Sequence, residues 1–480
     1  MTVWLNPNYT KPKSCAHKVD GTEAQNQAIN AIAEEFDVRK EQLEAIVKQF
    51  QEEIRKGLRN DGATVAMIPS FVSGRPTGEE TGRYLALDLG GTNLRVCEFS
   101  LEGNGKYSAK QQKFVVSEDL KRGEFRYLCD YIADCVDTFI TEHGSLEDSD
   151  GELQLGFTFS FPVWQTEINR GVLKQWTKGF SCPGAVNKDV TIMLQDAFRK
   201  KNIPVHIAAI VNDTVGTLMA YAYSEPSTAM GVIMGTGSNA SYYEKMSNLE
   251  KWSHGPAATD EMVINMEWGA FDCERRVLPF TIYDNKLDRE SINVGQQLYE
   301  KMISGMYLGE ITRNCMLQLI DRYLLFNGQS SQELNKQWSF ETAYMSAIEC
   351  DDSPDLTETK HILESTLNIP STTLADRQIV KKISNFVGRR AARLSACGLS
   401  AVMSHTGALD KNGVIAIDGS LFEFYPNYEN NMRQAISELY DAETAAKFKF
   451  ALARDGSGLG AAIIAMIAHK DALQKKQQKH

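Results

Sequence analysis

The sequence predicts an α/β protein that contains a duplicated unit. Two Gly- and Thr-rich turns, at residues 88–93 and 235–239, each lie between two short apolar strands. Strands and helices mix between residues 84 and 211, and a second mixed pattern begins at the second turn. Because the sequence has no short repeat of the solenoid type, the recurrence of the hairpin indicates a duplicated α/β unit.

Composition narrows the class of protein. A length of 480 residues allows two or three domains and a cleft between lobes. The net charge of −11, without a long basic run, argues against nucleic acid or an anionic membrane as the main partner and favours a small molecule. Nine scattered cysteines without a C-x-x-C pair are typical of reduced thiols. With no signal-peptide pattern and no run of 18 apolar residues, we expect a cytoplasmic protein without a membrane span.

The elements before the first turn are helical. Residues 1–21 lack periodicity and predict an N-terminal arm. Residues 22–25 read as a capping box, and two helices are expected from there to Leu58. The second of these helices carries one apolar face, formed by Leu43, Ile46, Val47, Phe50, Ile54 and Leu58.

The region from Tyr84 to Val211 predicts an α/β lobe. After the first hairpin we expect an amphipathic helix at 124–140, a strand at 153–161, a helix at 188–199 and a strand at 207–211.

The second half repeats the mixture. We expect the hairpin at Gly235, a helical region at 294–325, a polar surface excursion at 328–364, a long helix at 374–404 and a strand at 414–417. The Gly-rich stretch 455–460 then leads to an apolar helix at 461–468, and such an approach to a helix N-terminus is suited to an anion or a nucleotide.

The two turns have the composition of phosphate cradles. Glycines let backbone N–H groups approach an anion, and Thr92 and Thr236 add hydroxyl donors. Asp88 would repel a phosphate unless a hard cation such as Mg²⁺ lies between them, which implies a metal nucleotide. An ordinary tight hairpin is the alternative for either turn alone, and the recurrence makes it less favoured.

The candidate catalytic residues lie in the middle of the chain. Asp213 follows an apolar strand at the end where open α/β sheets bind ligands, and it is the candidate base. The alternative is that Asn212 and Asp213 only cap the following helix. Lys178 beside Thr177 can form a charge clamp on phosphoryl oxygens, or it can be an ordinary surface lysine.

Other enzyme classes are excluded by their missing motifs. The sequence has no H-x-x-x-H pair, no G-x-S-x-G and no G-x-x-x-x-G-K-[ST]. The glycine spacing at 456–460 also differs from that of a dinucleotide fingerprint.

Several motifs together resemble the hexokinase family, in the family's order and over roughly residues 25–470. They are LALDLGGTNLRV at 85–96, LGFTFSFP at 155–162, WTKGF at 176–180, NDTVGT at 212–217, GTGSN at 235–239, EWGAFD at 267–272, DGS at 418–420 and DGSG at 455–458. The stretches 263–269 and 304–310 are most similar to the fungal glucokinases.

The resemblance implies a two-lobed actin-like ATPase fold, related to ribonuclease H, with a cleft between a small and a large domain. It implies an N-terminal half at 25–222, whose small lobe covers about 82–211, and a C-terminal half at 223–470. This second half would be mostly large lobe, with about 452–468 returning to the small lobe.

Roles for individual residues are implied in the same way. Asp213 would be the base for the 6-hydroxyl of the sugar, and Lys178 would also be catalytic. The sugar would be held by Ser160, Thr177, Lys178, Asn212, Asp213, Asn239, Glu267 and Glu300. ATP would be bound by Asp88, Gly90, Gly91, Thr92, Asn93, Arg95 and Thr236, with Gly419, Ser420, Gly456 and Gly458 toward the adenosine. Asp88 would hold Mg²⁺, mainly through bound water.

The implied reaction is the ATP-dependent phosphorylation of glucose, with mannose or fructose as further candidate acceptors, by a monomer or a homodimer. The alternatives are an actin-like nucleotide-binding assembly or chaperone protein, which needs no sugar-binding set, and a glucose sensor without significant turnover.

Overall fold

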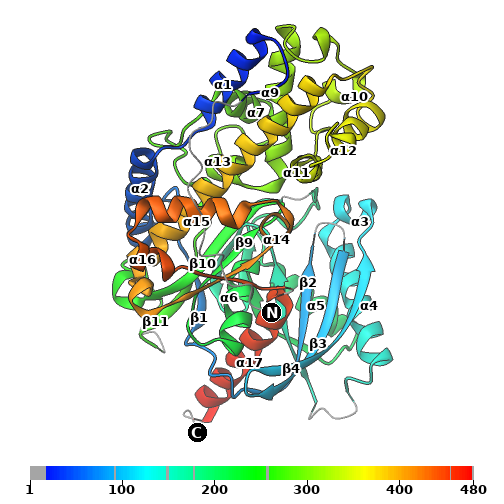
Figure 1. The fold of residues 1–480 in the computed structure, drawn as a ribbon. Helices are drawn as coiled ribbons and strands as arrows, with labels where there is room; N and C mark the ends of the chain where they lie inside the picture. The colour runs from blue at the N-terminus through cyan, green and yellow to red at the C-terminus, as the bar shows by residue number, and fades with distance from the viewer. Residues whose placement is uncertain are drawn as a thin grey trace. The chain divides into compact units, whose positions relative to one another are not determined.

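The computed structural model describes residues 18–90, 93–146, 151–176, 179–255, 259–454 and 456–477. These residues form two compact units, whose elements are labelled in Figure 1. The helical unit comprises the described residues of 18–39, 279–294 and 306–392, and the sheet unit comprises those of 40–278, 295–305 and 393–477. Predicted turn residues Gly91 and Thr92, clamp residues Thr177 and Lys178, and most of the N-terminal arm lie outside the described residues.

The strands are β1 (Ile68–Ser73), β2 (Thr81–Leu89), β3 (Asn93–Gly103), β4 (Lys106–Val115), β5 (Leu153–Phe159), β6 (Val163–Glu167), β7 (Arg170–Leu173), β8 (Val205–Val211), β9 (Thr228–Met234), β10 (Ser238–Lys245), β11 (Glu261–Asn265), β12 (Val414–Asp418) and β13 (Lys449–Leu452). The helices of the first half are α1 (Glu23–Phe36), α2 (Lys40–Arg59), α3 (Glu118–Arg122), α4 (Phe125–Glu142), α5 (Val190–Lys200) and α6 (Asp213–Ser224). Those of the second half are α7 (Ile282–Glu290), α8 (Leu298–Ile303), α9 (Gly305–Asp321), α10 (Gln332–Asn335), α11 (Thr342–Cys350), α12 (Thr357–His361), α13 (Leu374–Thr406), α14 (Ser420–Phe424), α15 (Tyr428–Leu439), α16 (Ala442–Ala446) and α17 (Gly456–Gln477).

The sheet unit contains two sheets whose strands pair in the same order. The five-stranded sheet runs β4-β3-β2-β5-β8, and the six-stranded sheet runs β1-β11-β10-β9-β12-β13. In each sheet an antiparallel hairpin, β2–β3 or β9–β10, is followed by two parallel strands. Both predicted hairpins are therefore confirmed, and the shared order agrees with the predicted duplication.

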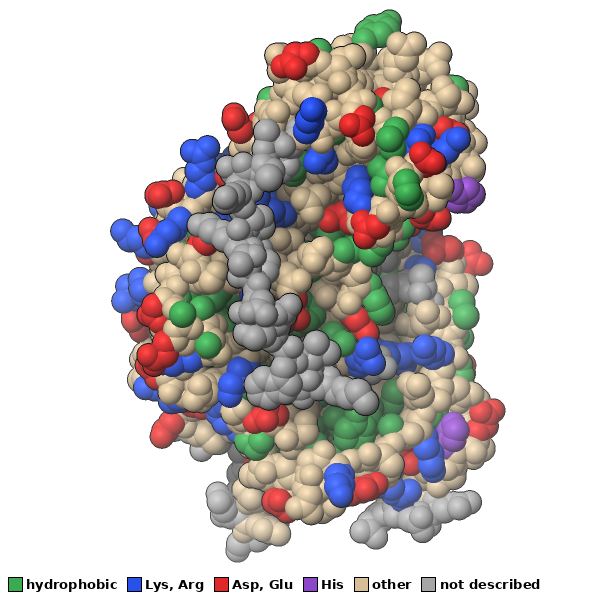
Figure 2. All heavy atoms as spheres, in the orientation of Figure 1, with side chains coloured by type: hydrophobic (Ala, Val, Ile, Leu, Met, Phe, Trp, Pro, Cys, Tyr) green, Lys and Arg blue, Asp and Glu red, His purple; other side chains and the backbone are tan. Residues whose placement is uncertain are grey.

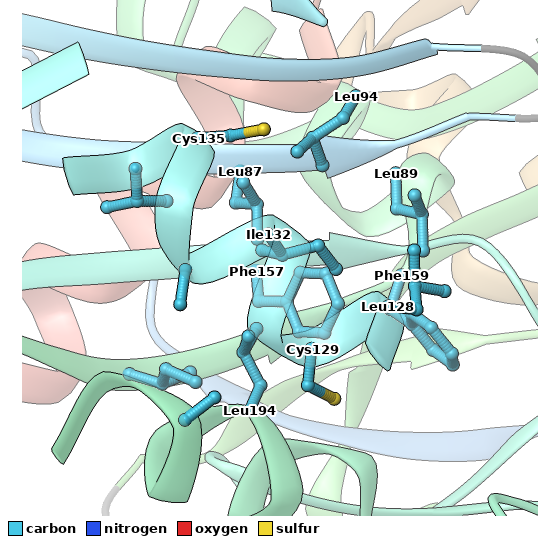
Figure 3. Close-up of a cluster of buried hydrophobic side chains, with 14 of the residues drawn as sticks. Leu87, Leu89, Leu94, Leu128, Cys129, Ile132, Cys135, Phe157, Phe159 and Leu194 are labelled. Carbon is cyan, nitrogen blue, oxygen red and sulfur yellow. The ribbon is translucent and has the colours of Figure 1, made fainter. Parts of the chain in front are cut away.

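A large hydrophobic core fixes the five-stranded sheet (Figure 3). Leu87 and Phe157 point from β2 and β5 toward Leu128 and Ile132 of α4, and Leu194 of α5 completes the contact. These side chains are at most 1 % exposed. The predicted amphipathic helix at 124–140 is α4, and its apolar face covers this side of the sheet.

Helices α6 and α17 contact each other in the sheet unit. α6 packs against β9 and β10, whereas α17, red in Figure 1, packs against β2, β5 and β8. A Cβ atom at Gly460 of α17 would collide with the carbonyl group of Gly216 in α6. The two backbones therefore approach more closely than any side chain would allow.

The helical unit is held by ion pairs within its core. Arg390 of α13 donates to both carboxylate oxygens of Asp284 in α7 over 2.7 and 2.6 Å. The guanidinium of Arg390 also lies 4.4 Å from the centre of the Phe36 ring in α1. The Thr22–Gln25 capping box that starts α1 is confirmed.

Three sequence predictions for the second half need correction. The segment 328–364 is not a surface excursion, because it forms α10–α12 and buries Leu334, Met345 and Ile348 completely. The helical region at 294–325 divides into α8 and α9 near Ser304. The helix predicted at 461–468 already begins at Gly456. Glycine has a low helix propensity, so the sequence predicts a loop there, but close packing against α6 favours glycine in this helix.

Among the described residues, none of the helices combines the length and the apolar composition that spanning a membrane would require. Figure 2 shows acidic and basic side chains interspersed over the visible face.

The contact between α6 and α17 predicts a difference between two neighbouring glycines. Gly460→Ala should lower the free energy of unfolding by about 1–3 kcal/mol, because the new methyl group collides with backbone atoms of Gly216. The matched control is Gly458→Ala, whose Cβ would lie at an ordinary 3.5 Å from the Phe99 ring. Both substitutions replace glycine by alanine in the same helix, so the change in helix propensity is similar. The difference between their free energies of unfolding, measured by urea denaturation, therefore reports the collision. Equal stabilities would contradict the close approach.

Candidate active site

Three parallel strands bring the predicted residues of the first half to one edge of the five-stranded sheet. Asp88 of β2 is in register with Thr158 of β5, and Thr158 is in register with Val211 of β8. Ser160 follows directly after β5, and Asp213 follows β8 after one residue, Asn212. The carboxyl ends of parallel strands meet at one edge, which is where open α/β sheets bind ligands.

Asp88 is held by two neighbours at this edge. Arg95, opposite it on β3, donates from Nη2 to Asp88 Oδ2 over 2.6 Å, and Ser457 Oγ of α17 donates to the same oxygen over 3.3 Å. Asp88 Oδ1 has no hydrogen-bond partner among the described residues. The turn itself is closed by a 2.9 Å bond from Gly90 N to the carbonyl oxygen of Asn93.

Asp213 is the first residue of α6, and Asn212 is its N-cap. Asn212 Oδ1 accepts from the backbone N–H of Thr214 over 3.0 Å and from its hydroxyl over 2.7 Å. The same N–H also donates to Asp213 Oδ1 over 2.9 Å. The capping role considered for Asn212 is therefore real, and it places the Asp213 carboxylate at the positive end of the helix dipole.

An aromatic cluster contains Trp176 and Phe180, which flank the undescribed residues Thr177 and Lys178 in the sequence. Trp176 stacks on Phe180 with ring centres 5.6 Å apart, and both contact Phe161, which follows Ser160. Trp176 also donates from Nε1 to the carbonyl oxygen of Cys182 over 2.8 Å. The residues on either side of the predicted charge clamp are therefore anchored.

The second turn lies against the turn at 418–420. Gly235 N donates to the carbonyl oxygen of Gly237 over 3.0 Å, and Thr236 is exposed. Gly419 has φ +129°, and a Cβ atom there would collide with the carbonyl of Met234. Only glycine fits this position next to Met234 and Gly235, and the predicted role of Gly419 and Ser420 toward adenosine stays a prediction.

An amide–carboxylate network connects the predicted sugar ligands of the second half. Asn239 Nδ2 donates to Asn265 Oδ1 over 2.7 Å and to Glu267 Oε1 over 3.4 Å. Asn265 Nδ2 donates to the same Glu267 oxygen over 2.9 Å. Glu300 Oε2 accepts from the backbone N–H of Ser238, the residue before Asn239, over 3.0 Å. Asn239, Glu267 and Glu300 are thus brought together.

A small cavity connects the two groups of residues. It has a volume of about 20 Å³ and is lined by Phe159 and Val211 of the five-stranded sheet, by the α6 N-cap Asn212, and by Ser70 and Asn265 of the six-stranded sheet. This volume holds about one water molecule. Ser241 of β10 also donates to the carbonyl oxygen of Thr214 over 2.8 Å, which ties the start of α6 to the six-stranded sheet.

Sequence reasoning missed Asn265 and Ser457. Asn265 is two residues before Glu267, and side chains two residues apart on a strand point to the same face, so this spacing could have identified Asn265. Ser457 stands inside a quoted motif, but only the fold shows that it contacts Asp88. A Cβ atom at Gly456 would lie 3.3 Å from the Thr217 backbone, whereas one at Gly458 would make an ordinary contact with Phe99, and the role of both glycines toward adenosine stays a prediction.

The residues at this edge are compatible with a magnesium nucleotide. Mg²⁺ keeps several waters and is commonly held by one or two carboxylates together with substrate phosphates. Among the described residues no three His, Cys, Asp or Glu side chains gather as an all-protein metal site. Asp88, with Oδ1 open to a hydrogen bond, is a suitable single carboxylate for the magnesium of a nucleotide.

Backbone strain at Glu267 gives a prediction on stability. Glu267 has left-handed φ 53° and ψ 49°, which costs about 1 kcal/mol for a residue with a Cβ atom. Glu267→Gly should therefore be more stable than Glu267→Ala by about 1 kcal/mol in urea denaturation. The control is Glu52, exposed in the middle of α2, where the order should reverse because glycine weakens a helix. The same order at both positions would contradict strain at Glu267.

Comparisons with known proteins match nearly the whole chain. Two family models, both described as hexokinase, match residues 28–223 and 229–467. The hexokinase of Kluyveromyces lactis is 43 % identical over 455 residues, which is 92 % of each chain. The glucokinase of Aspergillus niger is 40 % identical over 484 residues, covering 93 % of this chain and 98 % of that protein.

A solved structure agrees with these relatives. The hexokinase from Schistosoma mansoni, complexed with glucose, superposes with a TM-score of 0.82 at 35 % identity, and the match covers 92 % of this chain and 99 % of that one. The predicted α/β actin-like ATPase fold is confirmed by this match. Matching family models, sequence relatives and fold over more than nine-tenths of its length, the chain belongs to the hexokinase family.

Proposed function

We propose that this enzyme transfers the γ-phosphoryl group of MgATP to the 6-hydroxyl of glucose, giving glucose 6-phosphate and ADP. The family membership supports the reaction, and the similar Schistosoma mansoni structure contains glucose. The observation that carries the proposal is the shared edge of the five-stranded sheet, where β2 carries Asp88 on the nucleotide side and β8 leads into Asp213, the candidate base, with β5 between the two strands.

Asp213 has the right chemistry for the acceptor hydroxyl. As the oxygen of the 6-hydroxyl bonds to the γ-phosphorus, the bond to ADP breaks and the hydroxyl proton passes to the Asp213 carboxylate. In a loose transition state this proton leaves late, so a carboxylate that orients the hydroxyl is a sufficient base. The hydrogen bond from Thr214 N to Asp213 Oδ1 fixes the orientation of this carboxylate.

The remaining roles follow the family motifs. We propose that Ser160, Thr177, Lys178, Asn212, Asn239, Glu267 and Glu300 hold the sugar, with Lys178 also facing the transferred group. We propose that both glycine turns, with Arg95, Ser420 and their neighbours, bind ATP. Bound Mg²⁺ would neutralise phosphate charge, with Asp88 holding it through water.

The amide–carboxylate network favours a polyol. Glu267 Oε1 is occupied by two amide donors, so its position is set before a ligand arrives. Several prepositioned hydrogen-bonding groups discriminate well between polyols.

The assembly, chaperone and sensor alternatives are not favoured, since the matching relatives are hexokinases and a glucokinase. A cytoplasmic location, the glucokinase subtype and a monomeric or homodimeric state remain part of the proposal.

The reaction is tested by measuring ADP release from MgATP with glucose, mannose, fructose or no sugar. Rapid turnover with glucose and slow turnover with fructose would support a glucokinase, and comparable rates would indicate a broad hexokinase. ATP hydrolysis that does not depend on sugar would contradict the proposal.

The role of Asp213 gives a prediction on turnover. Asp213→Asn and Asp213→Ala should lower kcat by about 10²- to 10⁴-fold, because the acceptor hydroxyl loses its base. Glucose affinity, measured by isothermal titration calorimetry, should be largely kept. Asp196→Ala, an exposed aspartate of α5, is the control and should retain full turnover. Unchanged kcat in both Asp213 variants would reject this aspartate as the base.

A further inference from the structure

Helix α8 and the first residue of α9 contact the two ends of the second glycine turn. At one end the backbone N–H of Ser238 donates to Glu300 Oε2 over 3.0 Å. At the other end Gly305 N donates to the carbonyl oxygen of Gly235 over 2.8 Å. All four residues belong to the sheet unit. Glu300 of α8 and Gly305 of α9 therefore hold the turn that is proposed to bind phosphate.

The contact is tight at both ends. A Cβ atom at Gly237 would lie 2.9 Å from Glu300 Oε2, and one at Gly305 would lie 2.9 Å from the carbonyl oxygen of Gly235. Real Cβ atoms essentially never approach another heavy atom so closely. Because Gly305 faces a backbone oxygen, its close approach to the turn explains glycine at 305, whereas Gly237 faces the end of the flexible Glu300 side chain.

The core holds α8 in place. Tyr299, the residue before Glu300, is fully buried, and its ring packs edge-on against Phe50, Trp268 and Phe271 with centre distances of 5.4, 5.8 and 5.6 Å. Its hydroxyl donates to the carbonyl oxygen of Leu394 over 2.9 Å. Burial raises the pKa of Tyr299 well above its usual value, so this donor keeps its proton. The Glu300 backbone is therefore anchored next to the turn.

We propose that Glu300 is a positioning residue for the nucleotide turn in addition to a sugar ligand, so that sugar and nucleotide binding are coupled through this carboxylate. The inference rests on the proposed function, which assigns the sugar to Glu300 and the phosphates to the turn. A sugar hydroxyl bound to Glu300 limits the motion of this carboxylate, which already accepts a hydrogen bond from Ser238 N–H. The turn is then more ordered, and an ordered turn binds phosphate at a lower entropic cost. Such coupling is reciprocal, so nucleotide also strengthens sugar binding.

The test is the dissociation constant of a non-hydrolysable nucleotide in the absence of sugar. Glu300→Ala should weaken the binding of MgAMP-PNP about tenfold, because a charged acceptor of a backbone N–H is lost. Glu300→Gln keeps an acceptor oxygen of the same reach and should stay within about threefold of wild type. Both variants should lose glucose affinity. A residue that only binds sugar would leave sugar-free nucleotide affinity unchanged in either variant.

Two further variants separate the two substrates. Glu267→Ala, which removes the other proposed sugar carboxylate, should weaken glucose binding while MgAMP-PNP affinity is kept. Gly305→Ala should do the opposite, because its methyl group displaces the Gly235 carbonyl at the nucleotide end. In wild type, saturating glucose should tighten MgAMP-PNP binding, and Glu300→Ala should abolish that gain.

Wild-type affinity of Glu300→Ala for MgAMP-PNP without sugar would overturn the proposal. Should this variant not fold, as judged by circular dichroism, Gly305→Ala decides: unchanged nucleotide affinity there would equally overturn it. A failure of the proposed function would be distinguishable, since it would appear as the absence of glucose-dependent ADP formation in the wild-type enzyme.

Discussion

The close approach of helices α6 and α17 is the constraint on which the candidate active site depends. Gly216 and Gly460 let the two backbones meet where any side chain would collide. Because α6 packs on β9 and β10 and α17 on β2, β5 and β8, this contact joins the two sheets. Asp213 starts α6, and Ser457 in the first turn of α17 lies against Gly216, so the contact positions both helix starts.

Local signals allowed much of this arrangement to be predicted from the sequence. Both hairpins were predicted from Gly- and Thr-rich turns that lie between apolar strands. The start of α6 was predicted from an apolar strand that is followed by Asn212 and Asp213. The amphipathic spacing of α4 was equally informative, since its apolar face is a property of the segment alone. These features depend on neighbours within a few residues, which is the range over which patterns carry information.

Features that depend on distant contacts could not be predicted. Glu267 adopts a left-handed backbone, which favours glycine or asparagine, and the bonds from Asn239 and Asn265 accompany this unfavourable conformation. The glycines that begin α17 look like a loop until their contacts with α6 are known. Segment 328–364 has a polar sequence, yet Leu334, Met345 and Ile348 within it are buried, and burial of this kind depends on contacts with other parts of the helical unit.

The two sheets share a topology but differ in the chemistry at equivalent positions. β8 leads into α6 and β13 leads into α17, so the two helices that cross at Gly216 and Gly460 occupy equivalent places in the duplicated unit. The first residue of α6 is Asp213, whereas the first residue of α17 is Gly456. In the hairpins, the carboxylate of Asp88 stands two residues before the first glycine of its turn, and the apolar Ile233 stands two residues before Gly235. A phosphoryl transfer needs one base and one metal-side carboxylate, and a second of either would add repulsion next to a polyphosphate. The duplication therefore gives two similar turns, and the positions of Asp88 and Asp213 differ in chemistry from Ile233 and Gly456 in the second repeat.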